Sequence, residues 1–355
     1  MLQGVLVGQE TKVVFLPWEK AKLPQRVWPF FLPFMGCPSR CLYCAQSLTT
    51  GLGEKFPALE ERLAKLEGEL LALKQAQRPC PELAFYGGTF TNLPDTLRLL
   101  CLNFARKALD NGLILSWRCS TRPDCLDFSK LAELKAYKCS TVELGVQSFN
   151  DSVLASARRG YNGEQAQAAC LRVKEKGFVL GVQLLPGLPL STSKNFLFDV
   201  CESLRLGADC LRFYPCLVFK GTVLAKLYTN GCYQPWSLKE SVEALALAYL
   251  YAKKANVPVI RLGLAPEKDL QGAILAGPWH PQLGGLVLGQ ALYYEVAELV
   301  KSHGCTELVH LVLPRSVQGF FWGDKQSLVR SWASLGLKKS EVSFKKVGPL
   351  ELTML

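Results

Sequence analysis

Three cysteines lie within an eight-residue stretch, at Cys37, Cys41 and Cys44. A structural zinc site needs four ligands, and the surrounding sequence offers neither a second cysteine pair nor a nearby histidine. An iron-sulfur cube can be held by three thiolates, which leaves one iron open for another molecule. The alternative, that these are small buried apolar side chains, is weaker because free cysteines are seldom spaced so closely. The spacing therefore favours an iron-sulfur cluster on this loop.

The other cysteines and the histidines offer less chemistry. The chain has 14 cysteines and three histidines, and no histidines cluster in the sequence as a metal site would require. The cysteines outside the loop match no ligation pattern, so we expect small core side chains. Because the amino terminus does not resemble a secretory signal, we expect reduced thiols and a cytoplasmic protein. His280, in a Trp-His-Pro turn, is a further candidate for substrate contact, although loop histidines are more often structural.

Four further motifs follow the cysteines. They are Phe85-Tyr-Gly-Gly-Thr-Phe-Thr91, Ser120-Thr-Arg-Pro-Asp124, Glu143-Leu-Gly-Val-Gln-Ser148 and Gln183-Leu-Leu-Pro-Gly-Leu-Pro189. With Tyr43 before the last cysteine, the pattern resembles the radical S-adenosylmethionine (SAM) superfamily over roughly residues 28 to 220. It is most similar to the branch that contains the catalytic subunit of Elongator, the oxygen-independent coproporphyrinogen III oxidases and YhcC-like proteins.

The resemblance implies specific roles. Cys37, Cys41 and Cys44 would bind a 4Fe-4S cluster, whose open iron would chelate SAM. Residues expected to contact SAM are Tyr43, Gly87, Gly88, Thr89, Ser120, Gln147, Arg159 and Gln183. Arg159 would hold the SAM carboxylate, because a guanidinium can grip a carboxylate with two hydrogen bonds. The glycines would let the backbone approach the ligand. The glutamines would bond ribose or methionine groups, or alternatively satisfy neighbouring backbone.

This chain departs from the pattern of its resemblance in several places. Ser120 stands where related sequences have a glutamate expected to contact SAM, and Gly160-Tyr161 replaces a histidine. We expect no acetyltransferase domain after the barrel, so acetyl-coenzyme A chemistry is not implied. The residues after the cysteine loop lack the further cysteine of the coproporphyrinogen enzymes, which weakens an assignment to haem synthesis.

The elements that must position these residues alternate between strand and helix. An apolar stripe with steps of four and three predicts a helix through residues 59–73. Strands are expected near residues 27–34, 82–86, 113–118, 141–147, 178–185 and 210–219. Each carries its polar or glycine residues at its carboxyl end, the functional face of a barrel. No glycine-rich fingerprint marks a dinucleotide-binding sheet. The fold class is therefore α/β, an incomplete (βα)6 TIM-like barrel.

A small α+β lobe is expected at the carboxyl end. We expect an N-terminal extension over residues 1–26, the radical SAM partial barrel over 27–262 and the C-terminal lobe over 263–355. The lobe would contain a helix near 287–301, a strand at 307–313, a helix through Trp332 and a strand at 342–347. No apolar run approaches the roughly 18 residues of a membrane span, so we expect no membrane association.

The net charge of +11 permits an anionic partner but does not demand one. The lobe is basic between residues 315 and 346 and carries Phe320, Phe321 and Trp322, which could stack on unpaired RNA bases. The alternative is an ordinary solvated surface whose aromatics pack inside. Three functions stay open: a radical SAM enzyme acting on RNA, one of small-molecule, tetrapyrrole-like metabolism, and a non-enzymatic iron-sulfur or RNA-binding protein. An enzyme of this class would also need a low-potential electron donor.

Overall fold

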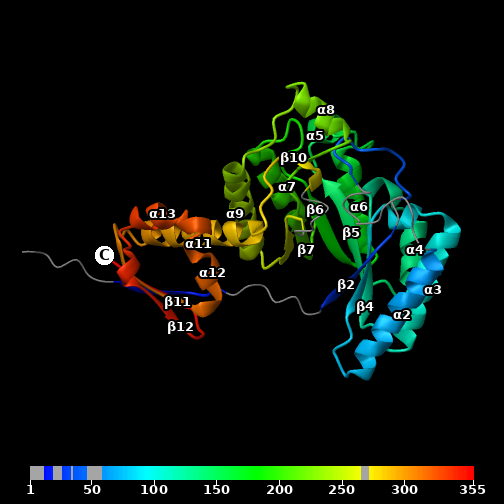
Figure 1. The fold of residues 1–355 in the computed structure, drawn as a ribbon, viewed down its shortest axis with the longest axis horizontal. Helices are drawn as coiled ribbons and strands as arrows, with labels where there is room; N and C mark the ends of the chain where they lie inside the picture. The colour runs from blue at the N-terminus through cyan, green and yellow to red at the C-terminus, as the bar shows by residue number, and fades with distance from the viewer. Residues whose placement is uncertain (1–11, 19–25, 33–34, 46–57, 265–271) are drawn as a thin grey trace, which may run out of the picture. The chain divides into compact units, whose positions relative to one another are not determined.

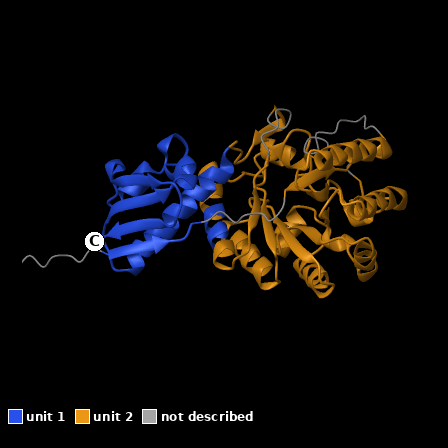
Figure 2. Cartoon of the chain, turned by 90° about the horizontal axis from the view of Figure 1, so that it is seen from below, with its two compact units in different colours: residues 1–22, 245–250, 282–355 blue, residues 23–244, 251–281 orange. Residues whose placement is uncertain are grey.

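The structure is a computed structural model that describes residues 12–18, 26–32, 35–45, 58–264 and 272–355. Contacts between residues group the chain into two compact units (Figure 2). The larger unit comprises residues 23–244 and 251–281, and the smaller comprises residues 1–22, 245–250 and 282–355. The three domains proposed from the sequence remain a prediction. The packing adds that residues from both ends of the chain fold into the smaller unit.

A seven-stranded parallel sheet forms the framework of the larger unit (Figure 1). Its order is β2-β3-β4-β5-β6-β7-β9, so the strands of this sheet lie side by side in the order in which they occur in the chain. The strands are β2 (Val27–Phe31), β3 (Glu82–Tyr86), β4 (Ser116–Thr121), β5 (Thr141–Gln147), β6 (Val179–Leu184), β7 (Cys210–Phe213) and β9 (Val259–Leu262). The sheet curls into an incomplete barrel, as expected from the sequence.

Helices connect the strands along the chain. They are α2 (Leu59–Gln75), α3 (Asp95–Asp110), α4 (Phe128–Ala136), α5 (Asp151–Ser156), α6 (Gly163–Glu175), α7 (Ser193–Arg205), α8 (Val223–Thr229) and α9 (Leu238–Lys254). In α2 the predicted stripe is buried through Leu59, Leu63, Leu66 and Leu70. Side-chain caps fix several starts, and Asn162 and Thr192 form capping boxes on α6 and α7. Six strand-helix units therefore precede β9, which closes the series as a seventh strand.

Two strand boundaries differ from the prediction. Residues 210–219 are not one strand, because β7 ends at Phe213 and a separate short strand, β8 (Val218–Phe219), pairs antiparallel with β10 (Ile274–Ala276). Pro215 lies between them and has no N–H to continue the parallel ladder. β4 begins at Ser116 and not near Leu113, because the Leu113 amide donates to Ala108 O at the end of α3.

The smaller unit is built on a four-stranded sheet in the order β1-β13-β11-β12. Its elements are β1 (Lys12–Leu16), β11 (Leu308–Pro314), β12 (Val342–Lys345), β13 (Leu350–Met354), α11 (Leu283–Ser302), α12 (Gln318–Phe321) and α13 (Val329–Ala333). The predicted helix at 287–301 and strands at 307–313 and 342–347 correspond to α11, β11 and β12. The prediction of one helix through Trp332 is wrong, because Gly323 adopts a φ of 71° between two short helices.

No helix in the described ranges is both long and apolar enough to cross a membrane. The sequence prediction of no membrane span therefore holds for the part of the chain that the structure describes.

Candidate functional site

A cavity of about 610 Å³ opens in the larger unit at the carboxyl ends of the parallel strands. The cysteine loop, which follows β2, lines it together with residues from β3 to β9. Ten of the eleven predicted site residues line the cavity, namely Cys37, Cys41, Tyr43, Cys44, Gly87, Gly88, Ser120, Gln147, Arg159 and Gln183. Thr89 is the exception, because it is fully buried with its Oγ1 3.1 Å from Cys37 Sγ. Thr89 is therefore placed to orient a cysteine and not to touch a ligand in the cavity. His280 is not among the lining residues.

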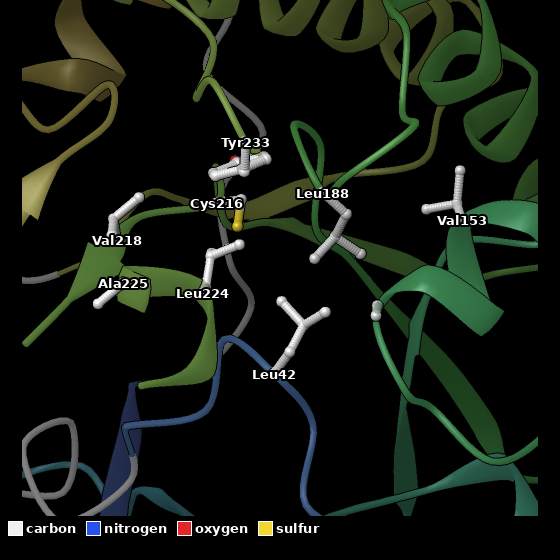
Figure 3. Packing of buried hydrophobic residues seen from close by; sticks show 9 residues of the cluster. Leu42, Val153, Leu188, Cys216, Val218, Leu224, Ala225 and Tyr233 are labelled. Carbon is white, nitrogen blue, oxygen red and sulfur yellow. The ribbon is translucent and has the colours of Figure 1, made fainter. Parts of the chain in front are cut away.

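The cysteine loop is anchored through Leu42, the residue between Cys41 and Tyr43. Leu42 is buried in an apolar cluster with Leu188, Cys216 and Leu224 (Figure 3). Its amide donates to Ala157 O at 3.3 Å, and its carbonyl accepts from Leu224 N at 2.9 Å. Since Leu42 faces the core, its two neighbours are left to face the cavity.

Gly87 and Gly88 make room for the chain that leads into this loop. Their φ values are 94° and 58°, in the left-handed region that favours glycine. A Cβ on Gly87 would lie 2.6 Å from Leu32 O, and one on Gly88 would lie 2.2 Å from Met35 O. The missing side chains thus allow backbone to approach backbone directly before Cys37. This contact is a local reason for both glycines, in addition to the ligand approach expected from the resemblance.

Arg159 is the centre of the buried polar contacts beside the cysteines. Its Nη1 donates to Cys41 Sγ at 3.1 Å and to Tyr43 OH at 3.1 Å. Its Nη2 donates to Gly145 O at 2.6 Å, and its Nε donates to Tyr161 OH at 3.0 Å. Burial opposes the charge, but the nearby Tyr161, Tyr43 and Cys41 outweigh it and hold the pKa of Arg159 above its ordinary value. The Tyr161 hydroxyl therefore helps to fix the guanidinium.

A second arginine, Arg122, approaches the same cysteine and was not singled out from the sequence. Its Nη1 lies 3.6 Å from Cys41 Sγ, while Asp124 receives its Nε and Nη2 at 2.8 and 2.7 Å. It also donates to the Arg159 carbonyl. Two guanidiniums therefore lie beside the sulfur of one of the three loop cysteines. The Ser-Thr-Arg-Pro-Asp motif was the signal that could have identified this role.

Glu143, in β5, is the common hydrogen-bond and ion-pair partner of several polar side chains inside the barrel. It is completely buried, with Arg118 Nη1 at 2.9 Å from Oε1 and Arg212 Nε at 2.7 Å from Oε2. Tyr86 OH donates to Oε1 at 2.8 Å. Burial raises the pKa of Glu143, but Arg212 and Arg118 outweigh it, so the pKa lies below its ordinary value. The sequence signal was a charged residue inside an otherwise apolar strand.

Gln183 joins this network and so already has protein partners. Its Nε2 donates to Glu143 Oε2 at 2.9 Å and to Ser120 Oγ at 3.3 Å. The Ser120 hydroxyl therefore gives the Gln183 amide nitrogen its second protein acceptor.

Gln147, at the end of β5, has an unusual backbone conformation, because its φ of 69° is rare for a residue with a side chain. A register irregularity between Gly145 and Gln147 accompanies it at the cavity edge.

The three cysteines offer the donor set of an iron-sulfur cluster. Three thiolates can hold a 4Fe-4S cluster and leave one iron open, whereas a structural zinc ion takes four ligands. All three cysteines line one cavity, none of them forms a disulfide, and no acidic residue is among the described lining residues. This donor set fits an iron-sulfur cluster.

Comparison with known families agrees with this donor set. Residues 31–196 match the radical SAM superfamily, and residues 208–292 match the radical SAM C-terminal domain. The chain belongs to the radical SAM superfamily, a superfamily of enzymes, as the sequence motifs predicted.

Similar proteins include acetyltransferases and Elongator subunits. The chain is 25% identical over 208 residues to tRNA uridine(34) acetyltransferase of Methanocaldococcus jannaschii, which covers 56% of this chain and 36% of that protein. The enzyme of the same name from Dehalococcoides mccartyi is 24% identical over 279 residues, covering 67% and 60%. Elongator complex protein 3 of Mus musculus is 28% identical over 185 residues, covering 46% and 34%. The chain thus spans less than two thirds of each relative.

A solved structure supports the same fold. Elp3 from Methanocaldococcus infernus, with an N-terminal deletion of residues 1–46, superposes with a TM-score of 0.57 at 21% identity. The superposition covers 79% of this chain and 64% of that chain.

Proposed function

We propose that this chain is a radical SAM enzyme whose cluster is held by Cys37, Cys41 and Cys44. When bound, a 4Fe-4S cluster would supply the electron that cleaves SAM reductively to methionine and a 5′-deoxyadenosyl radical, with a low-potential protein as electron donor. The observation that carries the proposal is that the three cysteines and seven of the eight predicted SAM contacts line one cavity. Since the site needs reduced thiols, the proposal includes a cytoplasmic location.

The chain's own residues would bind and orient the two cofactors. Arg159 and Arg122 donate to Cys41 Sγ and so orient this cysteine beside the cavity. Tyr43, Ser120, Gln147 and Gln183 line the same cavity, where they could contact SAM. Apolar side chains such as Phe31 line part of the cavity and would limit the water around bound cofactors.

The cluster is tested by metal content. After anaerobic reconstitution, we expect about four irons and four sulfides per chain, and Cys41→Ala should lose most of them. Cys170→Ala is the matched control, since Cys170 is equally buried but lies outside the cavity. Stoichiometric zinc in place of iron and sulfide would refute the cluster. With dithionite, the reconstituted protein should also convert SAM slowly to 5′-deoxyadenosine, measured by chromatography.

For the substrate, we propose RNA. The supporting observations are the relatives named as tRNA uridine(34) acetyltransferases and the basic surface of the smaller unit. Three of its lysines have protein partners, since Lys338 pairs with Glu341, Lys345 with Glu351, and Lys339 bonds Gln326. These pairs are exposed or half-buried and therefore weak, so the lysines can still bind phosphates.

The stacking role predicted for Phe321 is wrong. Phe321 is completely buried and stacks on Trp332 with ring centroids 4.5 Å apart, so it cannot receive a base. Trp322 packs edge-on against Phe321 at 4.6 Å. Phe320 and Trp322 are half-buried. The basis for RNA binding by this surface is therefore phosphate contact by lysine, with these two aromatics as the remaining candidates for stacking.

Binding of labelled transfer RNA at several salt concentrations tests the RNA proposal. Affinity should fall steeply with salt, and changing Lys338, Lys339, Lys345 and Lys346 to glutamine should reduce that slope. If the wild-type protein does not bind at low salt, a small-molecule substrate is favoured instead. If it binds but the four substitutions change nothing, RNA binds elsewhere on the protein.

A further inference from the structure

A register irregularity places two arginines side by side on the inner face of the barrel. In the pairing of β7 with β9, Leu211 lies opposite Val259, but Arg212 lies opposite Arg261. One residue of β9, Ile260, is therefore passed over, as in a β-bulge. Both arginines line the cavity. In a regular register the residue opposite Arg212 would be Ile260, so the bulge is what brings a second guanidinium to this wall.

The two arginines are compensated very differently. Arg212 has Glu143 Oε2 at 2.7 Å from its Nε and Tyr214 OH at 3.2 Å from its Nη1. Arg261 is partly buried, and its one hydrogen bond runs from Nε to Gly263 O at 2.8 Å. That bond holds the guanidinium in place, and within the described ranges its two terminal nitrogens have no protein acceptor. Adjacent like charges on neighbouring strands destabilise a sheet unless something compensates them.

At the wall of the cavity that β7 and β9 form, the arginines outnumber the carboxylates that pair with them. Arg118 pairs with both Glu82 and Glu143, and Arg212 pairs with Glu143. Two carboxylates therefore face these two guanidiniums, and Arg261 adds a third guanidinium that has no carboxylate partner in the part of the chain that the structure describes. Among the described residues that line the cavity none is acidic. An anion delivered by a ligand would balance Arg261.

Arg261 also differs from the arginines next to the cysteine loop. Arg159 and Arg122 contact Cys41, which follows β2, whereas Arg261 lies on β9 at the opposite edge of the sheet. Tyr214 and Phe219 line the cavity as well, and aromatic rings suit the face of a base. From this placement we infer that Arg261 binds a phosphate group of a nucleotide-bearing substrate. The inference rests on the proposed function and extends it to a substrate subsite.

The test compares ligands that differ only in a phosphate. Binding of uridine, uridine 5′-monophosphate and the trinucleotide UpUpU to the anaerobically reconstituted protein is measured by calorimetry. The monophosphate should bind about tenfold more tightly than the nucleoside, as expected for a charge-assisted contact. Arg261→Gln should abolish the difference, and Arg261→Lys should restore part of it. Arg78→Gln is the control, because it removes an arginine from an exposed site in the same unit. This variant should keep the difference in affinity between monophosphate and nucleoside.

The outcomes separate this inference from the proposed function. Equal affinity for nucleoside and monophosphate, or a preference that survives Arg261→Gln, would overturn the subsite even if the protein cleaves SAM. A preference that depends on Arg261 supports the subsite even if the preparation forms no 5′-deoxyadenosine. The failure to form 5′-deoxyadenosine would refute only the proposed function. If UpUpU binds more tightly than the monophosphate with the same dependence, the phosphate belongs to a strand. If UpUpU and the monophosphate bind with equal affinity, the phosphate that Arg261 binds belongs to a free nucleotide.

Discussion

At the scale of single residues, the interior of the barrel depends on the balance between Glu143 and its two arginines. A carboxylate that is completely buried would lose its charge without compensation, yet here its pKa is lowered because Arg212 and Arg118 surround it. The same carboxylate fixes Gln183 and Tyr86, which line the cavity. One buried ion therefore positions side chains from four strands.

Removal of this charge should be costly. Glu143→Gln leaves two guanidiniums facing a neutral amide, and we expect it to lower the free energy of unfolding by about 3–5 kcal/mol in urea titrations. Glu67→Gln is the control, because the Glu67 pair with Lys107 is largely solvent-exposed and should change stability by less than about 1 kcal/mol. Similar small losses for both variants would show that the network does not stabilise the barrel.

Asp199 makes stability depend on pH. Burial raises its pKa from an ordinary value of 3.8 to about 7, although the Phe149 amide and the Ser148 hydroxyl donate to it. The folded state therefore holds the proton more tightly than the unfolded state does. The resulting stability is present below about pH 4 and is lost as the pH rises towards 7 and above.

Asp199→Asn removes this ionisation while it keeps an acceptor for the Phe149 amide. Relative to the wild type, the variant should gain about 2–3 kcal/mol of stability between pH 5 and pH 8. Urea titrations at the two pH values measure the difference. A stability difference that is the same at both pH values would contradict a raised pKa for Asp199.

At the scale of elements, the sequence predicted residues that line the cavity better than it predicted the strands that carry them. The cysteine spacing, the polar strand ends and the family resemblance identified ten of the residues that line the cavity, because parallel strands bring their carboxyl ends to one edge. β9 was missed because its four residues resemble a short apolar stretch, and Arg261 was missed with it. The bulge that places Arg261 beside Arg212 depends on tertiary pairing, which no local pattern records.

The contact between the strand β3 end and the cysteine loop gives a further prediction. Gly88→Ala would drive a Cβ into Met35 O, so the loop must move, and we expect a loss of more than about 2 kcal/mol and of most cluster iron. Gly68→Ala, in α2 with open space around its Cα, should instead stabilise the protein by about 0.5–1 kcal/mol. Iron content and urea titration measure both. Full cluster loading in Gly88→Ala would show that this contact does not position the cysteines.

At the scale of the whole molecule, the smaller unit depends on segments far apart in the sequence. β1 pairs with β13 from Lys12 opposite Met354 to Leu16 opposite Leu350. β13 also pairs with β11, so it is the inner strand between two neighbours. The sequence prediction treated residues 1–26 as an extension, because nothing in a five-residue segment reveals a partner more than 300 residues away.

Deletion of residues 1–22 should therefore weaken the sheet at the far end of the chain. In an antiparallel strand alternate amides point to opposite neighbours, so β13 would lose protection for the amides that face β1 and keep it for those that face β11. Hydrogen exchange followed by mass spectrometry with peptide fragmentation measures this alternation across residues 350–354. The amides of β5, which lies between β4 and β6 in the larger unit, are the internal control and should stay protected. Unchanged exchange in β13 would mean that β1 does not pair there in solution, whereas loss at every β13 amide would mean that the whole four-stranded sheet requires β1 to fold.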